Sequence, residues 1–168
     1  MARKSKRVSL NCFRVILLQD SSVINFVEVY LSDDIIAGAA EFLYQLFSER
    51  PALTNISHIE LPPFEEHRQF ISGNPYQHWL ILEAGGEWVG SLHATKWNAI
   101  GVAILKAHQR KGYARHAIQK YVGTHAPLPP IPSIRRGAFT INVAPEYEAC
   151  KSLVKYLGGR LIHLTYEV

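Results

Sequence analysis

The chain has 168 residues, of which 48% are hydrophobic and 19% charged, and this length and composition predict one globular domain with a substantial core. They exclude collagen, coiled coil and disorder as descriptions of the whole chain, and no apolar run approaches the roughly 20 residues of a membrane-spanning helix. The net charge of +4 equals the charge of the four basic residues within residues 1–7, so it is a weak argument for nucleic-acid binding.

The N-terminal end is predicted to be a basic tail over residues 1–10, followed by one domain over residues 11–168. Polar residues interrupt the first apolar stretch and no small-residue cleavage site follows it, so we expect no export signal. Two cysteines, Cys12 and Cys150, are too few for a disulfide framework. We therefore expect a reducing, cytoplasmic location.

The first half of the chain predicts two strands followed by two helices. Apolar runs at 12–18 and 23–31, separated by a polar turn, are typical of a β-hairpin. Apolar residues at helical spacing predict an amphipathic helix over 34–48, which ends before Pro51. Paired prolines then favour a second, short helix over 63–71.

The second half predicts a hairpin-rich sheet with helices packed on it. Strands are expected at 79–83, 88–95, 99–105, 138–143 and 160–166. A helix is expected to begin near Gly112 and to end at Gly123, and a last helix is expected with Pro145 near its start and Gly158-Gly159 at its end. The buried stripe of the first of these helices is predicted to be Ala114, Ala117, Ile118, Tyr121 and Val122. Four prolines make 124–137 a loop, and the whole order of elements is typical of an α/β or α+β domain.

The distribution of charge inside the domain is uneven. Residues 88–145 contain no Asp or Glu but eight Lys or Arg, whereas a solvated surface normally mixes both signs. A polyanionic ligand on this part of the fold would explain the composition, and chance is the alternative.

The segment that follows the strand at 99–105 has the features of an anion-binding turn. A basic loop leads into a helix N-terminus, where unpaired N–H groups and the helix dipole favour a negative charge. Small residues at Gly112 and Ala114 allow the backbone to approach a phosphate closely, and Arg110, Lys111 and Arg115 add positive charge. An ordinary β-to-α turn is the alternative reading of the same residues.

The hexapeptide Gln109-Arg110-Lys111-Gly112-Tyr113-Ala114 resembles the Q/R-x-x-G-x-G/A signature of the GCN5-related N-acetyltransferases (GNAT). Two further stretches are similar to this family, Asn142 to Cys150 before the last helix and Leu157-Gly158-Gly159 at its end. Val89-Gly90 also matches a usual family position, so the similarity covers about residues 79–166.

The resemblance implies a single GNAT-like domain, with a central mixed, mostly antiparallel sheet flanked by about four helices, and acetyl-CoA as co-substrate. The loop 109–114 with Arg115 would hold the pyrophosphate through backbone N–H groups. The strand end at Ile104 and Leu105 would pair with the pantetheine chain, and a backbone N–H there would polarise the thioester carbonyl. Asn142 and Tyr147 of the second motif would complete the cofactor site.

The sequence departs from the family pattern where acid–base residues are usual. The family often has Asn at the position of Tyr147, Ser at Cys150 and Tyr at Val154, and many members have a Glu on the strand before the cofactor loop. Candidates for the proton transfers are therefore His58, His93 and Tyr166. Glu60 or Glu66 acting through water, and Tyr147 or Tyr156 as acids, remain alternatives.

Acetyl transfer to a primary amine of a small molecule or a protein, by direct attack, is the function that the resemblance implies. A CoA-binding or partner-binding module without catalysis is an alternative, and so is an acyltransferase that acts on nucleic acid with residues 1–7 as a tether. We expect no metal, because none of the eight histidines has the spacing of a zinc site. We expect no membrane partner, and a homodimer remains open.

Overall fold

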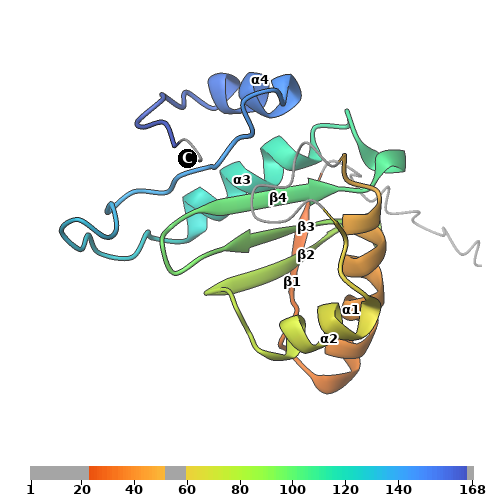
Figure 1. The fold of residues 1–168 in the computed structure, drawn as a ribbon. Helices are drawn as coiled ribbons and strands as arrows, with labels where there is room; N and C mark the ends of the chain where they lie inside the picture. Colours follow the sequence, from red (N-terminus) through yellow and green to blue (C-terminus); the bar gives the residue numbers. More distant parts are fainter. Residues whose placement is uncertain (1–22, 52–59, 166–168) are drawn as a thin grey trace, which may run out of the picture.

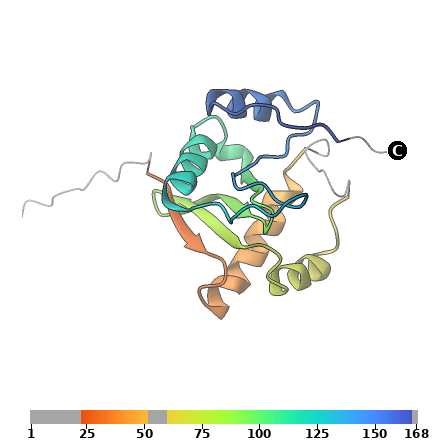
Figure 2. The same ribbon diagram turned by 90° about the vertical axis from the view of Figure 1, so that its left-hand side faces the viewer.

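The computed structural model describes residues 23–51 and 60–165 (Figures 1 and 2). A four-stranded antiparallel sheet in the order β1-β2-β3-β4 forms its centre. The strands are β1 (Asn25–Glu28), β2 (His78–Ala84), β3 (Glu87–Ala94) and β4 (Ile100–Ile104). The helices are α1 (Asp33–Ser48), α2 (Phe64–Ser72), α3 (Tyr113–Thr124) and α4 (Glu148–Tyr156), with a short 3-10 helix at Lys106–His108.

The sheet separates two hydrophobic cores, because successive side chains of a strand point to opposite faces. In β2, Trp79 and Ile81 pack with α1 and α2, whereas Leu80 and Leu82 pack with α3. A strand with both faces covered is apolar throughout, which explains the continuous apolar run of this strand. Figures 1 and 2 show α1 and α2 at one side of the sheet, and α4 beside α3 at the other.

The helix α1 follows the predicted amphipathic pattern. Ala39, Ala40, Leu43 and Leu46 are buried against the sheet. Its C-terminal end is fixed to the end of β4, because the N–H of Lys106 donates to a carboxylate oxygen of Glu49 at 2.9 Å. This contact positions the residues that follow α1 beside the edge strand.

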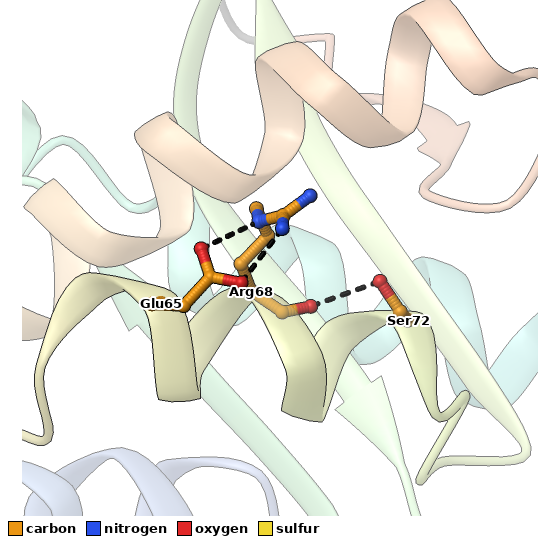
Figure 3. Close-up of polar contacts among 3 residues, drawn as sticks. All are labelled: Glu65, Arg68 and Ser72. Atoms are coloured by element: carbon orange, nitrogen blue, oxygen red, sulfur yellow. Dashed lines mark hydrogen bonds and ion pairs between the residues drawn. The ribbon is translucent and has the colours of Figure 1, made fainter.

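The helix α2 buries only His67 and Ile71, and its exposed surface combines polar residues with Phe64 and Phe70. Figure 3 shows the ion pair of this surface, in which Arg68 donates to both carboxylate oxygens of Glu65 at 2.7 and 2.9 Å, and the Ser72 hydroxyl donates to the Arg68 carbonyl at 3.0 Å. The pair is exposed, so we expect it to contribute little to stability.

Two predicted strands are wrong in the part of the chain that the structure describes. Residues 138–143 make one parallel bridge, Ala99 to Thr140, and residues 160–165 have no strand. The apolar pattern of both segments is typical of strands, but a strand also needs a backbone partner along its length, and local sequence does not reveal one. The first predicted strand, 12–18, lies outside the described residues.

The boundaries of the helices differ little from the predicted ones. The helix α3 continues to Thr124, past Gly123, and Val122 is 48% exposed rather than buried. The helix α4 has no fully buried residue, and it covers the core only with the partly buried Leu153 and Leu157. No described helix is long and apolar enough to cross a membrane.

Candidate active site

The edge strand β4 diverges from residues 138–143, the segment that the sequence predicted to be a strand. The N–H of Ile100 donates to the Thr140 carbonyl at 2.8 Å, and the N–H of Thr140 donates to the Asn98 carbonyl at 2.9 Å. Beyond this bridge the two segments form opposite walls of a cavity of about 170 Å³, residues 99–103 on one side and 141–144 on the other. The cavity is therefore a wedge that begins where the bridge ends.

The side chain of Asn98 fixes the narrow end of the wedge. It is buried, and its amide nitrogen donates to the carbonyls of Leu128 and Arg136 at 2.9 and 2.8 Å. Its amide oxygen accepts the N–H of Leu128 at 2.8 Å. These three bonds anchor the proline-rich loop, and hence the segment that follows it, to the start of β4.

The outer edge of β4 presents backbone groups to the wedge. Hydrogen-bonded and non-bonded positions alternate along an antiparallel pair, and the N–H of Leu105 donates to the Val89 carbonyl of β3 at 3.0 Å. The same register directs the N–H and C=O of Val102 and Ile104 away from β3. Of the two residues predicted to pair with an extended ligand, Ile104 therefore has its N–H on the open side, whereas the N–H of Leu105 is used within the sheet.

The predicted family position Gly90 has a packing reason. A Cβ atom at Gly90 would collide with the Ala103 carbonyl and lie 2.7 Å from the Ile104 side chain. Glycine at this position allows β3 to approach the edge strand closely.

The loop between β4 and α3 contains two residues with left-handed backbone conformations just before the helix begins. Arg110 and Gly112 have left-handed backbone conformations, with φ of 62° and 83°, and α3 begins at Tyr113 directly after Gly112. No side chain caps the helix, and its first turn has no acidic residue. The side-chain amide of Gln109 donates to the Ile104 carbonyl at 3.1 Å, which holds the loop against the end of β4. The N–H groups at the start of α3 therefore face a loop without negative charge.

Two buried nitrogens beside this loop fit a bound anion. A guanidinium nitrogen of Arg115 lies 2.9 Å from Nε2 of His116, and since the guanidinium only donates, the histidine proton is assigned to Nδ1. Nε of Arg115 and Nδ1 of His116 are buried and have no hydrogen-bond partner among the described residues. Both are donors, and a phosphate oxygen would satisfy them. The sequence analysis predicted Arg115 as a binding residue but missed His116. The available signal for His116 was its position four residues after Gly112.

His93 lies at the wall of the wedge in a tightly packed position. Its ring stacks on Tyr76 with centroids 4.1 Å apart, and it covers Gly101 so closely that no side chain would fit there. Burial, with a smaller effect of the Arg50 charge, lowers the pKa of His93 to about 4. The imidazole is therefore neutral near pH 7 and is a weak base.

Arg50 is a residue of the cavity that sequence reasoning missed. It follows α1, its guanidinium lies 5.3 Å from the centre of the Phe47 ring, and it lines the cavity with His93 and Tyr147. Burial lowers its pKa, although the nearby Tyr76 and Tyr147 oppose this effect. The available signal was a basic residue between an amphipathic helix and Pro51.

The remaining predicted site residues divide into three groups. Asn142, Tyr147 and Cys150 line the cavity, and burial raises the pKa of the Cys150 thiol. Tyr156 is 65% exposed and accepts a hydrogen bond from Arg115 at 3.1 Å, and Glu60 and Glu66 are exposed. His58 and Tyr166 lie outside the described residues, so their roles stay predictions. The described residues contain no group of three or more metal-ligating side chains.

The comparison with protein-family models finds one match, the Acetyltransferase (GNAT) family, over residues 40–127. No curated protein matches the sequence significantly. Among solved structures, the fold is similar to an acetyltransferase from Thermus thermophilus, with a TM-score of 0.62, 18% identity, and coverage of 83% of this chain and 88% of that chain.

Two similar structures contain coenzyme A. One is RimL, a ribosomal L7/L12 alpha-N-protein acetyltransferase, with a TM-score of 0.59, 17% identity, and coverage of 79% of this chain and 77% of that one. The other is an aminoglycoside N-acetyltransferase, with a TM-score of 0.57, 12% identity, and coverage of 87% and 93%. These structures share the fold, and the family model spans more than half of the chain, including β4, the loop that follows it and α3. The chain therefore belongs to the GNAT family of acetyl-CoA-dependent N-acetyltransferases.

Proposed function

We propose that this protein transfers the acetyl group of acetyl-CoA to a primary amine, on a small molecule or a protein, by direct attack. The observation that carries the proposal is the wedge between β4 and residues 141–144, on the strand from which the chain continues into residues 109–114, here named the anion loop, at the start of α3. When bound, acetyl-CoA supplies an acetyl group activated as a thioester.

The anion loop and the outer edge of β4 have separate binding roles in this proposal. Residues 109–114, with the buried donors of Arg115 and His116, bind the phosphates. The outward N–H and C=O of Val102 and the outward N–H of Ile104 hold the pantetheine chain as an added strand would be held. An N–H on this edge stabilises negative charge on the thioester oxygen, and Asn142 and Tyr147 form the opposite wall.

Direct attack is favoured because the cavity offers no activated nucleophile. Cys150 is the one thiol among the described residues, and its raised pKa keeps it protonated. The acceptor amine must lose a proton before it attacks, and the low pKa of His93 argues against this residue as the base. We propose His58 as the base, and Tyr166 or the cavity residue Tyr147 as the acid that protonates the departing thiolate.

The structures similar to this chain act on two different kinds of amine acceptor. RimL is described as acting on a protein N-terminus and another neighbour as acting on aminoglycosides, so the shared fold accommodates both kinds of amine. A module that binds CoA without catalysis is the second candidate, and the absence of Asp and Glu from the described residues that line the cavity favours it.

The test has two steps, binding followed by turnover. We expect acetyl-CoA to bind with a dissociation constant in the micromolar range, on the order of −7 to −9 kcal/mol by calorimetry. We then expect thiol release from acetyl-CoA that depends on one or more members of a panel of primary amines. Binding without turnover of any amine would support the non-catalytic module, and no binding would contradict both candidates.

The proton-transfer roles have their own test. His58→Ala should lower kcat/KM by roughly 10²–10⁴-fold and remove an inflection near pH 6.5, which is the usual pKa of an imidazole. Tyr166→Phe should slow the reaction with little change in acetyl-CoA affinity. Full activity of both variants would show that neither side chain moves a proton and that positioning of the substrates supplies the acceleration.

A further inference from the structure

The charged residues of the chain are divided between two halves of the fold. Residues 23–87, which include β1, α1, α2 and β2, contain ten acidic and two basic residues, whereas residues 88–165 contain two acidic and eleven basic ones. The proposed phosphate site explains the basic half but gives the acidic half no role. A positively charged ligand would be attracted to the acidic half and repelled from the basic one.

The acidic half contains a groove between α1 and α2, which lie side by side (Figure 1). Its volume is about 360 Å³, and its lining consists of apolar Ile36, Ala37, Ala40, Phe64 and Ile71 and polar Asp33, Glu41, Arg68 and Ser72. Ala40 and Ile71 are buried, whereas Phe64 is 38% exposed, so the groove has an apolar floor. No described residue lines both this groove and the wedge.

The groove has a negative charge that its own basic residue does not neutralise. Arg68 donates to both carboxylate oxygens of Glu65, which does not line the groove (Figure 3). Asp33 and Glu41 are exposed and take part in neither of the two ion pairs of the described residues. They are eight residues apart on α1, and hence about 12 Å apart along the helix axis.

The basic tail, residues 1–10, has features that are complementary to this groove. It contains no acidic residue, and its Lys and Arg residues form two pairs, at positions 3–4 and 6–7. In an extended segment these pairs are about 10 Å apart, which is close to the spacing of the two carboxylates on α1. Val8 and Leu10 follow directly, so the tail also contains apolar side chains that suit the floor of the groove.

The length of the chain before β1 allows the tail to reach the groove. Asp33 is ten residues after Val23, where the described chain begins, so the two residues are at most about 36 Å apart. The sixteen residues from 7 to 23 span roughly 50 Å when fully extended. A tether of this kind gives the tail an effective concentration of about millimolar, so a weak interaction is sufficient for docking.

We propose that the basic tail docks in the groove between α1 and α2 of its own chain. Its basic side chains pair with Asp33 and Glu41, and Val8 and Leu10 cover the apolar floor. The anion loop repels the tail, since both are positively charged, so docking also keeps the tail away from the proposed phosphate site. The inference does not rest on the proposed function, because it concerns a surface that shares no described residue with the wedge.

Crosslinking of the full chain with a carbodiimide, which joins a carboxylate directly to a lysine, locates the tail. We expect the tail lysines to be joined to Asp33 or Glu41 about tenfold more often than to Glu60 or Glu87, which are exposed acids outside the groove. Salt at roughly 1 M should remove most of this difference. An even distribution over the four carboxylates would overturn the proposal, and so would crosslinks confined to dimers, which would assign the groove to the tail of a second copy.

Proteolysis measures the occupancy of the groove by an independent readout. Trypsin cleaves after Lys and Arg, and a docked tail is protected from it. Asp33→Asn combined with Glu41→Gln should therefore raise the cleavage rate within residues 1–7 about 3–10-fold. Glu60→Gln combined with Glu87→Gln is the matched control, because it removes the same charge from the acidic half outside the groove and should leave the rate unchanged.

Thermal unfolding checks that both double variants fold, and the crosslinks of the wild type decide the question even where a variant does not. Equal cleavage rates in the wild type and both double variants would overturn the proposal. Neither measurement uses acetyl-CoA, so failure of the proposed function would leave this inference intact, and failure of this inference would leave the proposed function intact.

Discussion

The position of Gly112 has two features that favour glycine over every other residue type. Its φ of 83° lies in the left-handed region, and an added Cβ would lie 3.7 Å from the His116 ring and 3.8 Å from the Arg115 guanidinium. A side chain here would therefore extend beside the donors that we assign to the phosphates.

We predict that Gly112→Glu abolishes acetyl-CoA binding in calorimetry, because it adds negative charge and bulk at the anion loop. Gly123→Glu is the matched control, since a Cβ there meets nothing within 4 Å and the change in charge is the same. Gly112→Ala isolates the backbone strain, which should cost about 1–2 kcal/mol of stability. Unchanged affinity in Gly112→Glu would contradict our assignment of the loop.

His93 makes the stability of the protein depend on pH. Its pKa is 6.5 in an unfolded chain and about 4 in the fold, so between these values the unfolded state binds more protons. The stability that this residue contributes is complete above pH 6.5 and is lost as the pH falls to about 4.

We expect this loss to be about 3 kcal/mol, measured by urea unfolding at a series of pH values. His93→Phe keeps a ring against Tyr76 and should show a smaller slope of stability against pH over the same range. Part of the slope should remain, because burial also lowers the pKa of His67. An identical slope in both proteins would mean that His93 titrates normally in the fold.

At the scale of the elements, the wedge depends on where β4 stops pairing. Among the described residues, the bridge from Ala99 to Thr140 is the only strand pairing between the start of β4 and residues 138–143. Asn98 anchors the loop that returns the chain to β4 at these residues. The opening of the wedge should therefore be sensitive to this one buried amide.

We predict that Asn98→Ala destabilises the protein by about 3 kcal/mol, because it leaves the Leu128 N–H and two carbonyls without their partner. It should also raise the KM for acetyl-CoA, since the wall at 141–144 loses its anchor. Asn98 and Asn74 both have a positive φ, 63° and 44°, but the side chain of Asn74 is exposed, so Asn74→Ala is the control. Equal losses of stability in the two variants would assign the effect to backbone strain, and an unchanged KM would show that the anchor does not shape the site.

At the scale of the whole molecule, the four basic residues within residues 1–7 have a charge equal to the net charge of the chain. The anion loop, by contrast, belongs to the described fold. We predict that deletion of residues 1–7 changes acetyl-CoA affinity less than about twofold at roughly 0.15 M salt, where charges more than about 8 Å apart are screened. Calorimetry at two salt concentrations measures this. A loss of about tenfold or more would show that the tail belongs to the cofactor site.

Local sequence was enough to predict the strands β2, β3 and β4, the helices and the loop that we assign to anion binding. These features depend on local physics: alternation of apolar residues, helical spacing, and a glycine between basic residues at a helix start. The same residues carried the resemblance to the family, which the family model confirmed.

The packing of the elements, by contrast, determines which groups share the cavity. Arg50, His93 and Tyr147 are far apart in the sequence, and no local pattern predicts that they line one cavity. The predicted strand at 138–143 also fails for a non-local reason, because its pairing with β4 ends after one bridge. Hydrogen-bond partners and burial are properties of packing, so the wedge, the neutral imidazole of His93 and the position of Arg50 at the cavity emerge only when the elements are assembled.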